Sequence, residues 1–355
     1  MKTRFLQLRR TLSATLFVLM LNVLGMTGAF GQALVATLQH GENVSVFYGA
    51  NALVQAHDAA VCGDIITLPS GTFTAHNGIV ITKAITLRGS GCILDTITNV
   101  EPTIIPYIVV DIPEGDNGFL CEGFYFEYLN IDQLYNSKFI KCNIDNVSSS
   151  NGSSDTQNID FINCIIKDFN CQLGFANFQF FNSVVNLNNA GYRPGVHYEN
   201  GLSFINSIVF LSTSNTDGIL AQNSILLGCL EFNESLFTNC VNIGCYGHNI
   251  NMFSNQQNST NLSLEEYSDC FESFNGYDFY WGSSEEFSYS ERYILREDFA
   301  SSFLGTDGTE VGIHGGLAPY NTRPNYMVMK RGNVAVQSTV DGKLSVDIEV
   351  VTDGE

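Results

Sequence analysis

Two short segments in the middle of the chain carry side chains that could take part in catalysis. Asp217 lies in the run Ser214–Ile219, where its carboxylate could act as a general acid or base beside a partner carboxylate. Arg193 and His197 lie in a long excursion between repeats, residues 189–198, and such a basic pair could abstract a proton beside the carboxylate of an acidic sugar. These three residues are the candidate catalytic residues. A turn at Asp217 and a solvated loop at 189–198 are the alternatives without chemistry.

A third segment, residues 265–298, is rich in aromatic and acidic side chains and favours binding over catalysis. It includes the only tryptophan, Trp281, close to Tyr280 and Tyr277. Exposed rings offer flat faces to sugar rings, and the interleaved Asp and Glu residues could accept hydroxyl hydrogen bonds or hold Ca²⁺. Tyr277, Tyr280 and Trp281 are therefore the candidate ligand-binding residues. The alternative is that these rings pack a long loop against the body of the protein.

A repeated five-residue pattern predicts the elements that must position these segments. The pattern is aromatic, any residue, Asn, Cys or Ser, then aliphatic, and its clearest copies begin at Phe161, Phe180, Phe204 and Phe237. With two looser copies that begin at Phe139 and Ala221, the Cys or Ser positions lie 16 to 24 residues apart. An irregular period near twenty is typical of a solenoid, in which a fixed unit is joined by loops of variable length.

The composition of the unit predicts strands rather than helices. It is rich in Phe, Ile and Val, with Asn and Gly at its margins. A coil of this length can hold three short strands and three turns, which describes a parallel β-helix. Stacked coils would place Phe in one inward column, Cys and Ser in a second, and Asn in a hydrogen-bonded ladder at a turn.

The charge and composition of the chain exclude several partners. The formal net charge is −20, only 15% of residues are charged and 45% are hydrophobic, which argues against disorder. An acidic surface without basic patches repels nucleic acid and anionic membranes. It also repels an acidic polysaccharide unless cations bridge the two.

The N-terminus has the features of a secretory signal. Four basic residues among the first ten precede an apolar run over residues 12–30, with small residues suited to cleavage after Ala33. Cleavage would remove those four basic residues and no acidic one, so the charge of −20 would become −24. We expect an exported protein, extracellular, at the cell surface or periplasmic, without membrane insertion after cleavage. A membrane anchor is the alternative, weakened by Asn22 and Thr27.

The organisation expected from the sequence has four parts. They are a signal peptide (1–33), an N-terminal strand and capping helix (34–63), a parallel β-helix (64–320) and a C-terminal β tail (321–355). The tail is expected to form two strands around the turn Asp341-Gly342, either as a cap on the last coil or as an edge that pairs elsewhere.

Two stretches resemble known β-helix proteins. The sequence Gly-Asp-Ile-Ile-Thr-Leu-Pro-Ser-Gly-Thr-Phe (63–73), followed by Ile-Thr-Lys-Ala-Ile-Thr-Leu-Arg-Gly-Ser-Gly (81–91), resembles the entry of pectin-lyase-like right-handed parallel β-helix proteins. The segment 305–316 resembles the closing coil of secreted β-helix proteins of Bacteroides-like bacteria. The resemblance implies right-handed coils with a helix that caps the open end.

A further resemblance, at Asn215-Thr216-Asp217-Gly218, is to polygalacturonases, which are also β-helices. There the Asp works with an Asp-Asp pair one coil later, then a Gly-His-Gly loop and an Arg-X-Lys. Here the matching spacing falls on Thr238, Asn239 and Cys240, which carry no carboxylate, and no Arg-X-Lys follows. The resemblance therefore does not imply the two-carboxylate reaction.

The sequence predicts an all-β fold: a right-handed parallel β-helix with a short N-terminal capping helix and a C-terminal β tail. The function expected is a non-catalytic exported protein that binds a polysaccharide or surface glycan, with no cofactor except an optional Ca²⁺. The alternatives are a polysaccharide lyase or glycoside hydrolase with an unidentified site, and an adhesin-like spacer. Most cysteines are expected to be buried thiols, with Cys62 and Cys92 the best candidates for one disulfide.

Overall fold

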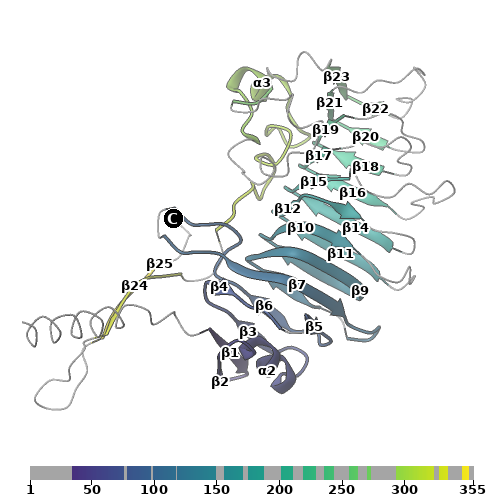
Figure 1. Cartoon of the computed structure of the whole chain (residues 1–355). Helices are drawn as coiled ribbons and strands as arrows, with labels where there is room; N and C mark the ends of the chain where they lie inside the picture. Colours follow the sequence, from purple (N-terminus) through teal and green to yellow (C-terminus); the bar gives the residue numbers. More distant parts are fainter. Residues whose placement is uncertain are drawn as a thin grey trace, which may run out of the picture. The chain divides into compact units, whose positions relative to one another are not determined.

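The computed structural model describes residues 34–75, 78–96, 99–116, 118–148, 156–170, 175–187, 201–210, 219–228, 236–243, 256–262, 270–272, 293–323, 328–334 and 346–351. Two ladders of parallel strands dominate it, and successive strands of each ladder come from successive coils (Figure 1). This arrangement is a parallel β-helix, as the repeat pattern predicts, and it fits a pectin-lyase-like fold.

The first ladder carries the aromatic position of the repeat. Its strands pair in the order β3 (Ile65–Thr67), β6 (Thr86–Arg88), β8 (Leu120–Glu122), the second half of β9 (Phe124–Ile140), β11 (Thr156–Ile162), β14 (Phe175–Phe181), β16 (Leu202–Ile205), β18 (Ile219–Gln222), β20 (Leu236–Thr238) and β22 (Gln256–Gln257).

The second ladder follows the turn that ends each repeat. It consists of β4 (Gly71–Thr72) and β5 (Ile79–Ile81), both paired with β7 (Thr103–Asp111), then the first half of β9, β10 (Asn143–Ser148), β12 (Ile165–Ile166), β15 (Val184–Asn186), β17 (Ile208–Phe210), β19 (Ile225–Leu227), β21 (Val241–Ile243) and β23 (Thr260–Leu262). A short strand β13 (Phe169–Asn170) also pairs with β10. β9 is long because it runs through both ladders.

The aromatic residues of the repeat stack inside the coils. Adjacent rings from Phe139 through Phe161 and Phe180 to Phe204 are nearly parallel, with centroids 4.8 to 5.2 Å apart. Phe237 lies one coil beyond Ala221 in the same register and is equally buried. This confirms the predicted inward column, whose spacing is that of neighbouring strands.

The Asn of the repeat provides the turn between the two ladders. Asn163, Asn182, Asn206, Asn223 and Asn239 all have φ between 47° and 53°, the left-handed region that Asn tolerates better than other non-glycine residues. The expected side-chain ladder is found in a different column, because Asn158 donates to Asn136 and Asn177 donates to Asn158, at 2.9 and 3.0 Å. The asparagines of the repeat itself reach another part of the chain, described below.

The Cys and Ser residues of the repeat form the predicted buried column. In Ser183 the hydroxyl accepts a hydrogen bond from the N–H of Cys164 (3.0 Å) and donates to carbonyls of Phe161 and Phe181 (3.2 and 2.8 Å). The thiol of Cys164 donates to carbonyl oxygens in the same way, at 3.4 Å. Ser259 extends the column by one coil, since its hydroxyl accepts from the N–H of Cys240.

The described cysteines are all free thiols. Burial raises the pKa of the Cys240 thiol to about 12, so this thiol stays protonated. The proposed bridge between Cys62 and Cys92 is wrong: Cys62 is exposed at a turn, whereas Cys92 is buried, and neither is bridged.

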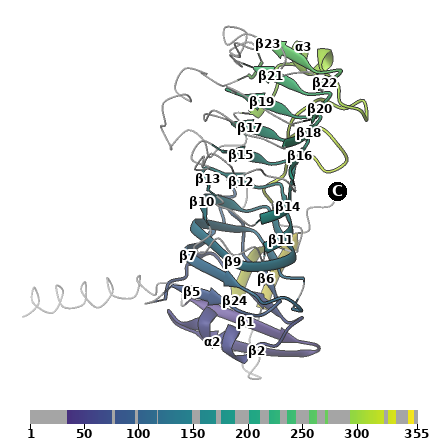
Figure 2. The same ribbon diagram turned by 90° about the vertical axis from the view of Figure 1, so that its right-hand side faces the viewer.

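The first coil is closed by an antiparallel hairpin and a helix. β1 (Val35–His40) pairs with β2 (Asn43–Tyr48) and with β3, both antiparallel, and α2 (Ala52–Ala59) lies beside β1 and β2 (Figure 2). The helix buries Ala52, Leu53, Ala56 and His57. Ala59 is exposed because it lies on the opposite side of the last turn.

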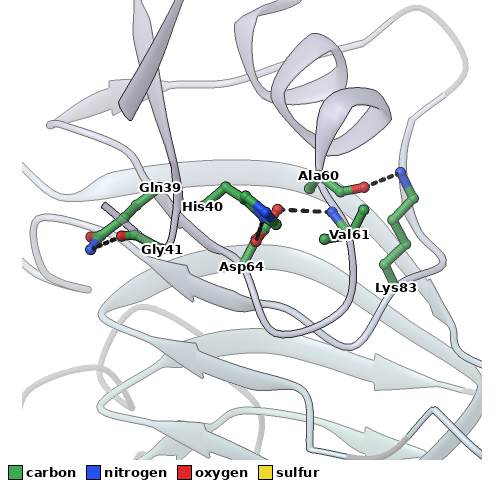
Figure 3. A network of polar contacts seen from close by, with 7 residues as sticks. All are labelled: Gln39, His40, Gly41, Ala60, Val61, Asp64 and Lys83. Carbon is green, nitrogen blue, oxygen red and sulfur yellow. Dashed lines mark hydrogen bonds and ion pairs between the residues drawn. The ribbon is translucent and has the colours of Figure 1, made fainter. Parts of the chain in front are cut away.

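Charged residues from three segments hold this cap in place (Figure 3). Asp64 accepts hydrogen bonds from the His40 ring (2.7 Å) and the Val61 N–H (2.9 Å). Burial alone raises the pKa of Asp64, but these two hydrogen bonds outweigh it and hold the pKa below its usual value. Lys83 donates to the last carbonyls of α2, those of His57, Asp58 and Ala60, at 2.6 to 3.0 Å.

Residues 293–323, which we call the strap, do not form another coil. They contain a short helix, α3 (Glu297–Ser302), and otherwise no strand of the parallel ladders. The closing coil expected at 305–316 is therefore wrong, since this segment packs on the outside of the existing coils. The C-terminal tail forms a separate antiparallel pair, β24 (Val328–Val334) with β25 (Val346–Val351). No helix in the described part of the chain is long and apolar enough to cross a membrane.

Candidate functional site

Three asparagines of the repeat, Asn182, Asn223 and Asn239, form hydrogen bonds with the strap. Asn182 donates its amide to the carbonyls of Ile313 (2.9 Å) and Gly315 (2.7 Å), and Asn223 accepts from the N–H of Thr306 (2.9 Å). At the level of the first looser copy, Lys141 donates to the carbonyl of Arg323. The strap therefore runs back along the turns, from late coils towards earlier ones.

Apolar residues of the strap cover the outer face of the later strands of the second ladder. Successive residues of a strand face opposite sides, so Ile165, Val184, Ile208, Ile225 and Val241 point away from the core. All five are nevertheless buried, in one cluster with strap residues that include Tyr293, Leu295, Phe299, Val311 and Ile313. We call the face over β12, β15, β17, β19 and β21 the covered half.

In the earlier coils the register partners of these five residues are Asn143 on β10, Tyr125 on β9 and Ile104 on β7. Three residues further along each of these strands, the outward positions of β7, β9 and β10 form a second part of the ladder, which we call the open half. Tyr107 and Tyr128 lie directly opposite each other on β7 and β9, and the two residues are 46% and 53% exposed. Their neighbours Ile108 and Leu129 face the core and are fully buried. Tyr107 and Tyr128 together form what we call the tyrosine platform.

A glycine determines how the first ring of the platform lies. A Cβ added to Gly78 would be only 2.5 Å from Cδ1 of Tyr107, so the ring packs directly over the Gly78 backbone. Gly78 also has φ +80°, a conformation that other residues adopt only with strain. The chain thus supports an exposed aromatic ring on bare backbone immediately before β5.

Polar side chains continue the row of the platform onto the next strands. Asn146 lies opposite Tyr128 on β10, and its amide donates to a carboxylate oxygen of Asp168 at 3.2 Å. A parallel row includes Asn130, whose amide donates to Asp132 (3.0 Å) and whose oxygen accepts from Ser148 (3.4 Å). These hydrogen bonds fix the orientation of the amides beside the two rings.

A charged cluster lies next to these rows. Asp145 accepts a hydrogen bond from the hydroxyl of Tyr125 and forms an ion pair with Lys167, both at 2.6 Å. The Lys167 ammonium lies 5.7 Å from the centre of the Tyr125 ring, within range of a cation–π contact. Burial, the hydrogen bond to Asp145 and its negative charge together raise the pKa of Tyr125, which therefore keeps its proton.

The arrangement suits binding better than proton transfer. The Lys167 side chain is only 17% exposed and is engaged with Asp145, so it is not a free base. Two exposed rings beside fixed amides and a carboxylate offer stacking and hydrogen bonds to a sugar. Within the described ranges, no three His, Cys, Asp or Glu side chains gather in a way that could hold a metal ion.

The site residues proposed from the sequence are not among those that the structure describes. Arg193, His197 and Asp217 lie outside the described ranges, as do Tyr277, Tyr280 and Trp281. Of the positions compared with the polygalacturonase pair, Thr238 ends β20 and Asn239 forms the turn, where it donates to the carbonyl of Leu304.

The tyrosine platform was missed by the sequence interpretation, although a signal for it exists. Tyr107 and Tyr128 are 21 residues apart, which is one coil. After Tyr128 apolar and polar residues alternate through Leu129, Asn130, Ile131 and Asp132, so this ring and its partner one coil earlier fall on the face opposite to the core. Comparison of the coils before residue 139, which lack the Asn-Cys/Ser pattern, could have revealed the pair.

Comparisons with known proteins do not assign the chain to a family. No family model matches it, and neither a curated protein nor a solved structure matches it significantly.

Proposed function

We propose that the chain is an exported β-helix protein, of the secreted kind found in Bacteroides-like bacteria, that binds a glycan on the open half without cleaving it. The observation that carries this proposal is the tyrosine platform, two exposed rings in register on adjacent coils. Exposed aromatic pairs beside oriented polar groups are common where proteins hold ligands with one apolar face and a polar edge.

A pyranose ring has both features that the open half can recognise. Its C–H face can lie on Tyr107 or Tyr128, while its hydroxyls can exchange hydrogen bonds with Asn146 and Asp168. Because β7, β9 and β10 hold three of these residues and the hydrogen bond from Asn146 orients Asp168, which lies between β12 and β13, little conformational entropy is lost on binding. A flat, open face of this kind binds a polymer more readily than it encloses a small molecule.

Export is supported by the basic, apolar and small-residue regions of the first 33 residues. Expression of the full chain in a Gram-negative host, followed by mass spectrometry of the exported protein, tests this directly. We expect a mature N-terminus at Leu34. Recovery of only the uncleaved chain in the cytoplasm would contradict export and leave the binding proposal to be judged separately.

Calorimetric titration of the mature chain with a panel of soluble polysaccharides tests binding. Tyr128→Ala should weaken affinity by about 1–3 kcal/mol, a range taken from aromatic stacking on nucleobases, whereas Tyr128→Phe keeps the ring and should bind like the native protein. Tyr48→Ala, which removes an exposed tyrosine from β2 far from the ladder of β7 and β9, is the matched control. Equal affinity in Tyr128→Ala and the native chain would refute the platform.

The charged cluster favours a second candidate function, a polysaccharide lyase or glycoside hydrolase. A lysine paired with a carboxylate and a tyrosine whose raised pKa keeps it protonated could serve as base and acid if a substrate displaced Asp145 from Lys167. Release of reducing ends or of unsaturated products, abolished in both Lys167→Met and Tyr125→Phe, would establish the enzyme. We expect no release from either polygalacturonate or neutral polysaccharides.

A further inference from the structure

The polar and aromatic positions of the open half form one row that crosses the strands. Tyr107 on β7, Tyr128 on β9 and Asn146 on β10 are register partners in turn, and the Asn146 amide contacts Asp168 in the following coil. Neighbouring parallel strands are about 4.8 Å apart, which is close to the length of one sugar residue in an extended β-linked chain. One row therefore offers four positions at the repeat of such a chain.

A ligand that followed a strand would meet a different set of groups. Beyond Tyr107 on the same face of β7 comes Val109, and beyond Tyr128 on β9 comes Asn130, which is buried. Such a ligand would contact one ring only. Only a ligand that crosses the strands uses both rings and then the Asn146–Asp168 pair.

The charge of the open half limits the ligand further. Glu127, Asp132, Asp145 and Asp168 lie on or beside the row, and the positive charge of Lys167 is compensated by Asp145 at 2.6 Å. The whole chain is also acidic, with a formal charge of −20. A carboxylate on each sugar residue would meet net repulsion, which is strongest at low salt.

We infer that the ligand is an unbranched, β-linked glycan without carboxylates, which crosses the strands with successive residues on Tyr107, Tyr128, Asn146 and Asp168. This inference rests on the proposed glycan binding and assigns to it a ligand class, a direction and a number of subsites. Asp168 is the residue that selects against acidic sugars, because it places a carboxylate where the fourth sugar residue would lie.

Affinity measured against chain length tests the number of subsites. The probes are β-1,4-linked gluco-, manno- and xylo-oligosaccharides, from disaccharides to hexasaccharides, titrated into the mature chain. Affinity for the series that binds should rise with each residue up to the tetrasaccharide and then level off. In Tyr107→Ala the gain in affinity from the trisaccharide to the tetrasaccharide should disappear, so that the affinity levels off at the trisaccharide.

Oligomannuronates of the same lengths, which keep the β-1,4 linkage of the manno-oligosaccharides and add a carboxylate to each residue, test the ligand class in low salt with a chelator. We expect at least tenfold weaker binding than for the neutral series, and we expect Asp168→Asn to reduce that ratio by about threefold or more because it removes the repelling charge. Asp132→Asn, which removes a carboxylate from the neighbouring row, is the matched control and should change the ratio less.

The outcomes separate the two proposals. Tighter binding of oligomannuronates than of the neutral series, lost in Tyr128→Ala, would overturn the ligand class and keep the glycan site. An affinity that does not rise beyond the disaccharide would overturn both the inferred direction of the glycan across the strands and the inferred four subsites. Binding of no glycan, or binding that Tyr128→Ala leaves unchanged, would overturn the proposed function and this inference together.

Discussion

The covered and open halves belong to the same ladder of parallel strands. They differ in whether their outward side chains are buried under the strap or exposed. In the covered half these residues are aliphatic, such as Val184, Ile208 and Ile225, and the strap buries them. In the open half the outward positions, which lie three residues further along the strands, carry Tyr107, Tyr128 and several charged or amide side chains. The inward residues of both halves are fully buried, Ile108 and Leu129 in the open half and Val185, Val209, Leu226 and Asn242 in the covered half, so the outward side chains distinguish the two.

The difference shows how one ladder of a solenoid can contribute to stability in some coils and to ligand binding in others. Where outward residues are apolar, the protein gains stability by folding its own C-terminal segment over them. Where they are aromatic and polar, exposure costs little, and the groups remain accessible to a ligand. Substitutions in the covered half should therefore change stability, whereas substitutions in the open half should change binding.

The largest expected effect is in the covered half, at Ile313. This strap residue is 1% exposed and packs in the cluster with Ile208 and Ile225, so Ile313→Ala should lower the free energy of unfolding by about 2–5 kcal/mol. Leu317, on the same strap, is fully exposed, and Leu317→Ala should leave stability within about 0.5 kcal/mol of native. Guanidinium unfolding followed by circular dichroism measures both. Equal stability of the two variants would show that the strap does not seal this face.

The open half should show the opposite pattern. Tyr128→Ala removes a ring that is 53% exposed, so unfolding should change by no more than about 0.5 kcal/mol while glycan affinity falls. Guanidinium unfolding and calorimetry on one preparation give both values. A loss of stability as large as that of Ile313→Ala would mean that the ring is structural, and the contrast between the halves would fail.

The sequence predicts the interior of the coils far better than their exterior. The columns of Phe161 and Cys164 follow from a repeat, because every coil places equivalent residues in one environment. The strap is not predictable in this way, since residues 293–323 contact each coil through different groups, such as the carbonyl of Ile313 and the N–H of Thr306. Consecutive apolar pairs such as Ile165-Ile166 do indicate a strand that is buried on both faces, but they do not say what covers it.

The two asparagine columns allow a finer comparison. Asn182 and Asn158 both have positive φ, and glycine can adopt this conformation without strain, so Asn→Gly removes only the side chain. Asn182→Gly should cost about 1–3 kcal/mol, because it leaves the buried carbonyls of Ile313 and Gly315 without their donor. Asn158→Gly removes an exposed amide and should cost less than about 1 kcal/mol. Thermal or guanidinium unfolding of the two variants measures both losses of stability. A larger loss in Asn158→Gly would mean that the exposed asparagine ladder is the more stabilising of the two columns.

The smallest expected effect is a pH dependence that belongs to the covered half. His314 lies on the strap with its ring against Tyr320, and burial lowers the pKa of His314 below its ordinary value of 6.5. The unfolded chain therefore binds a proton at His314 more readily than the folded one. The contribution of His314 to the free energy of unfolding is complete above about pH 6.5 and is lost as the pH falls towards the lowered pKa of the folded state. Burial and the nearby Lys83 lower the pKa of His57 as well, so the native chain should lose stability from two sites in this range. His314→Gln should show a shallower loss between about pH 7 and pH 5, with the contribution of His57 remaining, when unfolding midpoints are compared at equal ionic strength. If the unfolding midpoint changes equally with pH in His314→Gln and in the native chain, the strap does not exclude the charged imidazole.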